Sequence, residues 1–356
     1  MLPRPEPSGG VAYYDKELAA RLTFSEKCRD NYQRYQRRHL TEDRSSPDYL
    51  PVKLDIEGVS RCNFSCTMCA VSKWDKGTRA RDMTLDELKG LIDEQYGLVE
   101  IKLNGIGEPL MAGDVFFEMI RYARKRRIWV RITTNASLLH LRENYKKLLD
   151  SDVNEIDISI DGHDAPTFEG IRIQSDASRV FRNCQLLNDY CLEKGVVRTK
   201  MWTLVQKGNV RNLEEHVYHA AWLGFRNLVF SLQLHGWGDN DLESRNRAEM
   251  AVVERARLEG LVALGKTQGV RVSFWDVSDK FDSQNLCPWP FERAVVTSDL
   301  RTVPCCMIGD PDKFELGKGL SFMKAWKSDE YRDFRASHLA GQIPSVCRGC
   351  YKGMKE

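Results

Sequence analysis

Three cysteines stand close together in the first fifth of the chain, in the sequence Cys62-Asn-Phe-Ser-Cys66-Thr-Met-Cys69. Their spacings of four and three residues allow one loop to place three thiolates around one small group. Three thiolates suit a [4Fe–4S] cluster and leave its fourth iron without a protein ligand, whereas a structural zinc normally takes four protein ligands. We therefore expect an iron–sulfur cluster with one open iron. The alternative is a zinc site that borrows a distant fourth ligand.

A second group of cysteines lies towards the end of the chain. Cys347 and Cys350 form a Cys-x2-Cys pair, which is a common start to metal coordination. Cys287 and Cys305 flank a hairpin-like stretch whose closure would bring them together. Four thiolates from these positions would complete a cluster that has no open iron, with a structural zinc as the alternative. Cys306 is next to Cys305, and we favour Cys305 because adjacent thiolates seldom bind one cluster.

The elements that must position these cysteines alternate regularly from residue 52 onward. Short apolar or β-branched runs are followed by amphipathic stretches, six times over, and this pattern is typical of parallel strands joined by crossover helices. We expect an α/β fold, a partial (β/α)6 barrel similar to an incomplete TIM barrel, with ligands at the carboxyl ends of the strands. The predicted strands are Lys53–Ile56, Val99–Leu103, Ile128–Thr133, Glu155–Ile160, Arg198–Leu204 and Asn227–Leu232, and a further one at Val270–Phe274. The predicted helices are Thr84–Tyr96, Val115–Arg126, Glu143–Leu149, Ala177–Glu193, Leu213–Leu223 and Glu243–Gly265.

The pattern breaks near residue 280, where cysteines, prolines, the hairpin-like stretch Ala294–Thr302 and a late helix over Phe322–Leu339 follow. We expect three parts: a helical extension over 1–50, the barrel over 51–280 and a small cysteine-rich domain over 281–356.

The formal net charge of +2 favours no nucleic-acid partner, and no apolar run has the length of a membrane span. The polar start is unlike a secretory signal, so we expect a cytoplasmic protein and read the isolated Cys28, Cys184 and Cys191 as packed thiols.

The Cys-x3-Cys-x2-Cys loop after the first strand, with Phe64 and Met68 between its cysteines, resembles the radical S-adenosylmethionine (SAM) superfamily. The resemblance implies that the amino and carboxylate groups of SAM chelate the open iron. It also implies that one electron from the reduced cluster cleaves SAM and that the 5′-deoxyadenosyl radical abstracts a hydrogen from a substrate. The expected cofactors are therefore SAM and [4Fe–4S] clusters, and a flavodoxin or ferredoxin is the expected external reductant.

Further motifs that resemble the superfamily lie at the ends of successive predicted strands. Asn104-Gly-Ile-Gly-Glu108-Pro is similar to a glycine-rich segment whose carboxylate accepts the ammonium of SAM, although Ile106 replaces a common glycine. Thr-Thr-Asn135 is similar to a turn that shapes the site, with Ala136 in the place of a glycine. In Ile-Ser159-Ile-Asp161-Gly, the resemblance implies that the serine faces the cofactor and that the aspartate reaches the ribose or the substrate side. By the same resemblance, Arg172 lies near the methionyl carboxylate.

The segment after residue 280 resembles the auxiliary-cluster extension of these enzymes, which exists in a longer SPASM form and a shorter twitch form. Leu316-Gly and Trp326-Lys-Ser support that resemblance. Because few residues follow Cys350, we expect the twitch form, in which Cys287, Cys305, Cys347 and Cys350 hold a second [4Fe–4S] cluster.

The favoured reaction is hydrogen abstraction from a small polyhydroxylated substrate, a sugar, aminosugar or cyclitol, followed by dehydrogenation or epimerisation at a carbinol carbon. A fully ligated auxiliary cluster suits an electron acceptor, and such a reaction requires a general base. His235 is the candidate base because its unperturbed pKa lies near neutrality; Glu57 is either a second substrate-side candidate or a packed strand-end group. The alternatives are a peptide-modifying radical enzyme and, more remotely, a non-catalytic iron–sulfur or zinc protein.

Overall fold

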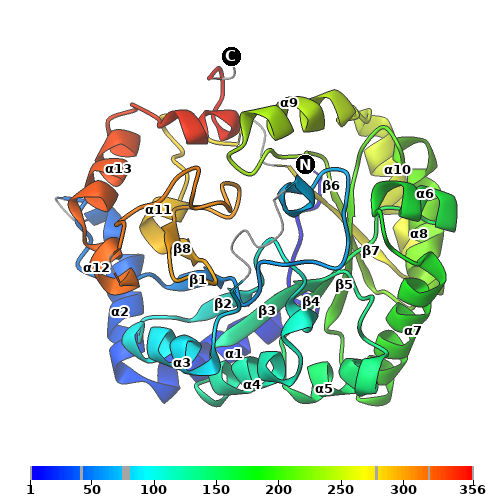
Figure 1. Ribbon diagram of the computed structural model, residues 1–356, viewed down its shortest axis with the longest axis horizontal. Helices are drawn as coiled ribbons and strands as arrows, with labels where there is room; N and C mark the ends of the chain where they lie inside the picture. Colours follow the sequence, from blue (N-terminus) through cyan, green and yellow to red (C-terminus); the bar gives the residue numbers. More distant parts are fainter. Residues whose placement is uncertain (1, 41–42, 74–80, 277–279, 320, 355–356) are drawn as a thin grey trace.

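A curved, mainly parallel sheet forms the centre of the computed structural model (Figure 1), which describes residues 2–40, 43–73, 81–276, 280–319 and 321–354. The strand order is β7-β6-β5-β4-β3-β2-β1-β8-β9, and only the β8–β9 pair is antiparallel. Because the order is linear, the described strands form an open barrel. The strands are β1 (Lys53–Ile56), β2 (Glu100–Leu103), β3 (Trp129–Thr134), β4 (Glu155–Ser159), β5 (Thr199–Leu204), β6 (Asn227–Ser231), β7 (Arg271–Trp275), β8 (Arg293–Val296) and β9 (Thr302–Val303).

Helices surround this sheet on its convex side and at its two ends (Figure 1). The α-helices are α1 (Val11–Phe24), α2 (Glu26–Gln36), α3 (Leu85–Glu94), α4 (Asp114–Lys125), α5 (Asn144–Asp150), α6 (Ala165–Ile171), α7 (Ala177–Glu193), α8 (Leu213–Trp222), α9 (Asn240–Glu249), α10 (Arg255–Thr267), α11 (Trp289–Glu292), α12 (Phe322–Trp326) and α13 (Asp329–Leu339). Short 3-10 turns are η1 (Arg38–Leu40), η2 (Ala70–Lys73), η3 (Pro109–Ala112), η4 (Leu141–Glu143), η5 (Val210–Asn212) and η6 (Ser345–Cys350).

The predicted α/β fold and its seven strands are confirmed, each strand within one residue of its expected ends. The expected helices Glu243–Gly265 and Phe322–Leu339 are wrong because each contains a break, and the expected helical extension is likewise divided. Ser25 has an extended backbone and its side chain accepts a hydrogen bond from the backbone N–H of Cys28, so α2 starts anew there. Ser328 starts α13 in the same way. Met250 is extended and pairs with Gln206 in an isolated bridge, which separates α9 from α10.

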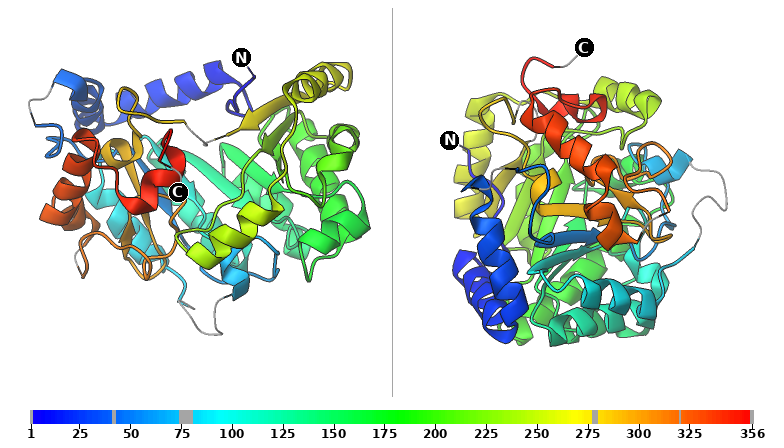
Figure 2. Two further views of the ribbon diagram at one scale, coloured as in Figure 1. Left: turned by 90° about the horizontal axis from the view of Figure 1, so that it is seen from above. Right: turned by 90° about the vertical axis from the view of Figure 1, so that its left-hand side faces the viewer.

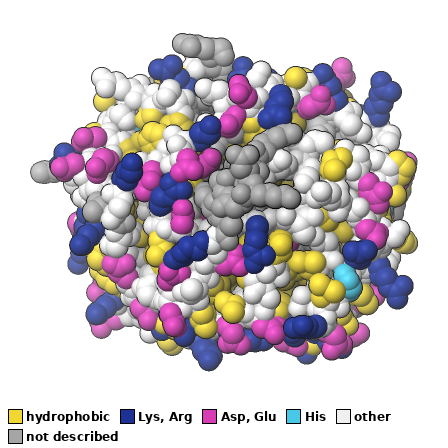
Figure 3. Space-filling model, in the orientation of Figure 1, with side chains coloured by type: hydrophobic (Ala, Val, Ile, Leu, Met, Phe, Trp, Pro, Cys, Tyr) yellow, Lys and Arg dark blue, Asp and Glu magenta, His cyan; other side chains and the backbone are white. Residues whose placement is uncertain are grey.

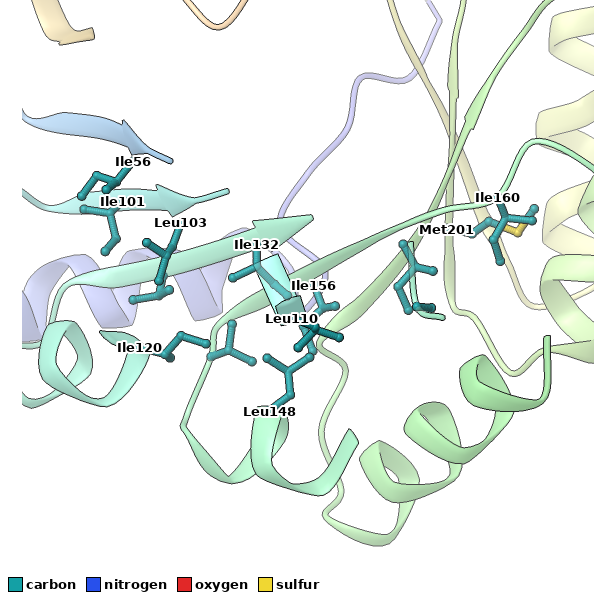
Figure 4. Packing of buried hydrophobic residues seen from close by; sticks show 14 of the residues in the cluster. Ile56, Ile101, Leu103, Leu110, Ile120, Ile132, Leu148, Ile156, Ile160 and Met201 are labelled. Atoms are coloured by element: carbon teal, nitrogen blue, oxygen red, sulfur yellow. The ribbon is translucent and has the colours of Figure 1, made fainter. Parts of the chain in front are cut away.

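The main core lies between the convex face of the sheet and the helices. Ile56, Ile101 and Ile132, on neighbouring strands, have no exposed surface and belong to one apolar cluster. Figure 4 shows Ile120 of α4 and Leu148 of α5 reaching this face from the helix side. Successive residues of a strand point to opposite faces of the sheet. The residues next to each of these isoleucines along its own strand therefore point to the concave face.

The N-terminal extension covers the end of the barrel opposite the strand carboxyl ends, with α1 running across it (Figure 2). The buried Arg21 guanidinium donates to the backbone oxygens of Tyr96, Leu98 and Arg126. Closer to the start of the chain, the backbone N–H of Ser8 donates to Glu155 at 3.1 Å. The extension is therefore bound to the strands that carry the site.

The cysteine-rich segment continues the sheet of the barrel. β8 pairs in parallel with β1, with Lys53 opposite Arg293 and Ile56 opposite Val296. The expected hairpin is present as β8 and β9, but its attachment to β1 was not expected. The boundary that we placed at residue 280 stays a prediction; residues 277–279 beside it lie outside the described part of the chain.

Basic and acidic side chains are interspersed on the face seen in Figure 3. Among the described residues, no helix combines the length and the apolar character that crossing a membrane requires.

Candidate active site

The first cysteine loop follows β1 and lies at the carboxyl ends of the strands, as expected. Its backbone is held by α6 and the turn after it: the N–H groups of Ser65 and Thr67 donate to the carbonyl oxygens of Ile173 and Ile171 at 2.9 and 3.0 Å. Burial raises the pKa of Cys62 to about 12 and that of Cys69 to about 11. Thiols in such surroundings ionise when a positively charged metal centre binds them. This set of donors fits an iron–sulfur cluster.

The loop after β2 packs directly on the cysteine loop. The N–H of Glu108 donates to the carbonyl oxygen of Arg61 at 2.9 Å. A Cβ atom on Gly107 would lie 2.5 Å from the carbonyl oxygens of Val59 and Arg61, so only glycine allows this approach. The buried Glu57 carboxylate accepts from the N–H groups of Ile106 and Ser298, which agrees with its reading as a packed strand-end group.

Glu108 is 2% exposed and its carboxylate binds three donors. Oε1 accepts from the Thr134 hydroxyl at 2.7 Å and the Leu110 N–H at 3.1 Å, and Oε2 accepts from the Asn135 N–H at 2.8 Å. A carboxylate has roughly four acceptor positions, so about one on Oε2 is left for an ammonium group. Burial raises the pKa of Glu108 to about 7 despite these hydrogen bonds.

Because only the ionised Glu108 attracts an ammonium, SAM binding is expected to weaken as the pH falls below 7. With a pKa of about 7, the apparent affinity should be about tenfold lower at about pH 6 than at about pH 7.5. Equilibrium dialysis of labelled SAM against the reconstituted protein measures this change. The Glu108→Gln variant is the control and should bind weakly with no dependence on pH in this range. An equal slope in both proteins would contradict the role of Glu108.

Asn135 links the third strand to the cysteine loop. Its Nδ2 donates to Asn63 Oδ1 at 3.0 Å and to Cys62 Sγ at 3.8 Å. Together with its backbone bond to Glu108, this contact makes Asn135 a second connection between the first two loops. Sequence analysis expected a shaping turn here and missed the contribution of Asn63.

Asp161 and Arg172 form a buried ion pair, with Oδ2 and Nη2 2.8 Å apart and the two side chains 0% and 9% exposed. Asp161 Oδ1 also accepts from the N–H of Leu204, and Arg172 Nη1 donates to Cys66 Sγ at 3.8 Å. We expected these two residues to face different parts of the cofactor. The structure pairs them with each other beside a cluster thiol, and their roles towards SAM stay predictions.

Ser159 and His235 are not brought into this network. Ser159 ends β4, and within the described part of the chain no hydrogen bond joins it to the other candidates. The backbone oxygen of His235 accepts from Asn246 Nδ2, which also donates to the carbonyl oxygen of Met68 in the cysteine loop. Burial lowers the pKa of His235, so its imidazole is neutral at neutral pH. A catalytic role for His235 stays a prediction, whereas Asn246, on α9, joins the segment after β6 to the cysteine loop, a contact that the sequence did not reveal.

The auxiliary cysteines gather in two adjoining apolar clusters in the C-terminal segment. Cys287, Cys347 and Cys350 pack around Phe281 and Tyr351, and the N–H of Cys287 donates to the Tyr351 hydroxyl at 3.0 Å. Burial raises the pKa of Cys287 to about 12, and the charge of Cys350 adds to this effect. In the described ranges, no three or more His, Cys, Asp or Glu side chains are placed to hold a single metal ion. The assignment of iron–sulfur clusters therefore rests on the family models reported below.

Cys305 and Cys306 are distinguished by their neighbours. Both pack in the cluster around Val303 and Ile308. The hydrogen bond that the Cys305 thiol donates to Cys306, burial and the charge of Cys287 all raise the pKa of Cys305. The groups that act on Cys306, after its bond to Cys305, are Asp55, Lys102 and Arg293, which all belong to the barrel sheet. The charges that act on Cys305 thus include another auxiliary cysteine, whereas those that act on Cys306 come from the sheet.

Replacing Cys305 with alanine is therefore expected to remove the auxiliary cluster, while Cys306→Ala should retain it. The bound iron should fall from about eight to about four atoms per chain in the first variant only, since each cubane holds four. Iron analysis after anaerobic reconstitution checks this, and the two adjacent cysteines are matched controls for each other. The reverse pattern would assign Cys306 as the ligand.

Comparison with known protein families identifies both parts of this arrangement. Residues 56–217 match the model of the radical SAM superfamily, and residues 287–351 match SPASM, an iron–sulfur cluster-binding domain. The chain belongs to the radical SAM superfamily. Its C-terminal segment is a SPASM/twitch-type domain, and its cofactors are SAM and [4Fe–4S] clusters.

The radical SAM relatives include the mycofactocin maturase MftC of Mycolicibacterium smegmatis. It is 27% identical over 315 residues, which cover 84% of this chain and 77% of the relative. The AdoMet-dependent heme synthase of Methanosarcina barkeri is 36% identical, but over only 113 residues, or 31% of either protein. The first alignment therefore extends well beyond the superfamily core.

Solved radical SAM structures share the fold. Streptococcus suis SuiB bound to the precursor peptide SuiA matches 90% of this chain and 73% of SuiB, with a TM-score of 0.64 and 12% identity. anSMEcpe with bound AdoMet matches 85% of this chain and 92% of its own, with a TM-score of 0.59 and 20% identity. At these identities the likeness concerns the fold alone.

Proposed function

We propose that this radical SAM enzyme modifies a peptide. The observation that carries the proposal is the 315-residue similarity to a maturase, because it includes the barrel and reaches most of the chain. The similarity of fold to SuiB, whose structure holds a precursor peptide, is consistent with it. These comparisons support the alternative in our sequence analysis better than its main hypothesis of a sugar or cyclitol substrate.

When bound, the first cluster and SAM would supply the radical chemistry that removes a hydrogen atom from the substrate. The residues of this chain bind and orient the reactants. Cys62, Cys66 and Cys69 are proposed to hold the first cluster, and Glu108 to accept the SAM ammonium through its free position on Oε2. Cys287, Cys305, Cys347 and Cys350 are proposed to hold the auxiliary cluster, which would supply an electron acceptor close to the substrate. A flavodoxin or ferredoxin is proposed as the external reductant.

The experiment compares two substrate classes with one preparation. The reconstituted protein, reduced with dithionite and supplied with SAM, is incubated with synthetic peptides from the short reading frames beside its gene, or with a panel of aminosugars and cyclitols. We expect a peptide to raise 5′-deoxyadenosine formation above the substrate-free rate and to change in mass. A sugar or cyclitol that does both, while no peptide does either, would overturn the proposal.

A further inference from the structure

The concave face of the barrel sheet is charged, in contrast to its apolar convex face. Charged residues occupy alternate positions of consecutive strands, and the register places Asp55 of β1 beside Lys102 of β2 and Lys102 beside Arg131 of β3. Residues in such a row share one face. The charged residues of this face in β1–β5 and β8 are Lys53, Asp55, Glu100, Lys102, Arg131, Glu155, Asp157, Lys200 and Arg293.

Each carboxylate of this face lies within 4 Å of at least one cation, and Glu100 and Glu155 each lie near two, because Arg293 also contacts Glu100 and Arg131 also contacts Glu155. The shortest N–O contact of each carboxylate is Lys53–Glu100 at 3.4 Å, Arg293–Asp55 at 3.6 Å, Arg131–Asp157 at 2.7 Å and Lys200–Glu155 at 2.9 Å. Charges that are removed from water need such partners, because the cost of removing an ion from water is several kcal/mol. The pairing therefore explains eight of the nine charged side chains and leaves Lys102.

Lys102 has no hydrogen bond or ion pair within the described ranges, although it is partly buried at the centre of this row. Its neighbour in register on β1 is Asp55, which pairs with Arg293, and the charge of Lys102 also acts on the carboxylates of Asp55 and Asp157. Lys102 is thus the cation of this row that, among the described residues, makes no direct ion pair. A partly desolvated ammonium attracts an anion more strongly than one in bulk water.

The position of Lys102 places this charge between the two cluster loops. Its strand ends one residue later, and the glycine-rich segment that leads to Glu108 follows directly. On the other side, Lys102 is one of the charged groups that act on Cys306 of the auxiliary segment. Ile106 of the glycine-rich segment also packs against Gly309 of the auxiliary segment, since a Cβ atom on Gly309 would lie 2.9 Å from Ile106 Cδ1. A substrate that receives the radical and then passes an electron to the auxiliary cluster must lie between these loops.

We infer that Lys102 binds a carboxylate of the substrate on the concave face of the barrel. This inference rests on the proposed function and deepens it, because it assigns a carboxylate to the part of the peptide that enters the barrel. The carboxylate is either an acidic side chain or the carboxyl terminus of the peptide. A lysine suits this task because its ammonium is a compact charge on a flexible stem.

The test measures the acetylation rate of Lys102 by mass spectrometry. The oxidised, SAM-loaded holoenzyme is treated with an acetylating N-hydroxysuccinimide ester in the presence of a probe. N-acetyl-glutamic acid α-amide carries only a side-chain carboxylate, and N-acetylglycine carries only a terminal one. At about ten times its dissociation constant, a bound carboxylate should slow acetylation of Lys102 about tenfold. The exposed Lys324 on α12 is the internal reference and should react at an unchanged rate.

The neutral probes N-acetyl-glutamine α-amide and N-acetylglycinamide are the matched controls. Protection by either carboxylate, and not by its amide, supports the inference, and the stronger probe identifies the source of the carboxylate. Ligand-observed NMR should also show binding of that probe to the wild-type protein and Lys102→Arg, and its loss in Lys102→Met. Equal protection by the amides, no protection at all, or binding to Lys102→Met would overturn the inference.

These measurements need no turnover, so their failure is distinguishable from failure of the proposed function. Peptide-dependent 5′-deoxyadenosine formation without carboxylate protection would refute only the role of Lys102. Carboxylate protection in a protein that modifies no peptide would instead refute only the peptide substrate.

Discussion

The Cys66→Ala variant is expected to lose SAM cleavage completely and to contain about four iron atoms per chain in place of about eight. Cys66 is 8% exposed in a loop held by α6, and its sulfur is 3.8 Å from Arg172 Nη1. With two thiolates left, the loop lacks the third ligand of a cubane. Iron analysis and chromatography of 5′-deoxyadenosine after anaerobic reduction measure both effects.

The matched control for this variant is Cys184→Ala. Cys184 is fully buried in α7, and its pKa is raised by burial alone, so it is a packed thiol. The same substitution there should leave the iron content and product formation unchanged. If Cys66→Ala retained its iron and still cleaved SAM, the first cysteine loop would not be the cluster site.

The Asp161→Asn variant is expected to lower the free energy of unfolding by about 3–5 kcal/mol, because it leaves the buried Arg172 guanidinium without a counter-charge. The ion pair is 2.8 Å long and almost fully buried, so solvent screens it little. Urea unfolding of the cluster-free chain, followed by circular dichroism, measures the loss. It also separates this effect from any change in cluster content.

The matched control is Glu259→Gln, which breaks the exposed Arg255–Glu259 pair one turn apart on α10. An exposed pair contributes only about 0.5 kcal/mol, so this variant should be close to the wild-type protein. If the two variants were equally stable, the Asp161–Arg172 pair would have no special structural role.

The fold could be predicted because its signal is local. The alternation of apolar runs with amphipathic stretches gave the strands, and strand ends located the cysteine loop and Glu108. The helix breaks were missed because Ser25 and Ser328 cap new helices inside continuous helical patterns. The pairing of β8 with β1 depends on contact between residues more than 230 positions apart, which periodicity does not report.

The site was predicted less completely because its side chains bind one another. The resemblance identified Asp161 and Arg172 separately, but their ion pair is a property of two loops in space. The choice between Cys305 and Cys306 likewise depends on which side of the hairpin each faces. The charges of the concave face are visible in sequence as alternating polar positions, such as Glu100-Ile-Lys102-Leu, but only the structure shows that, among the described residues, Lys102 makes no direct ion pair while its neighbours in register do.

The measurement that tests the central claim most directly is the formation of 5′-deoxyadenosine by the wild-type chain. After anaerobic reconstitution with iron and sulfide, the protein is reduced with dithionite, given SAM and analysed by chromatography coupled to mass spectrometry. We predict 5′-deoxyadenosine and methionine in equal amounts, dependent on reductant and absent in Cys66→Ala. A wild-type protein that holds its full complement of iron and forms no 5′-deoxyadenosine would contradict the account.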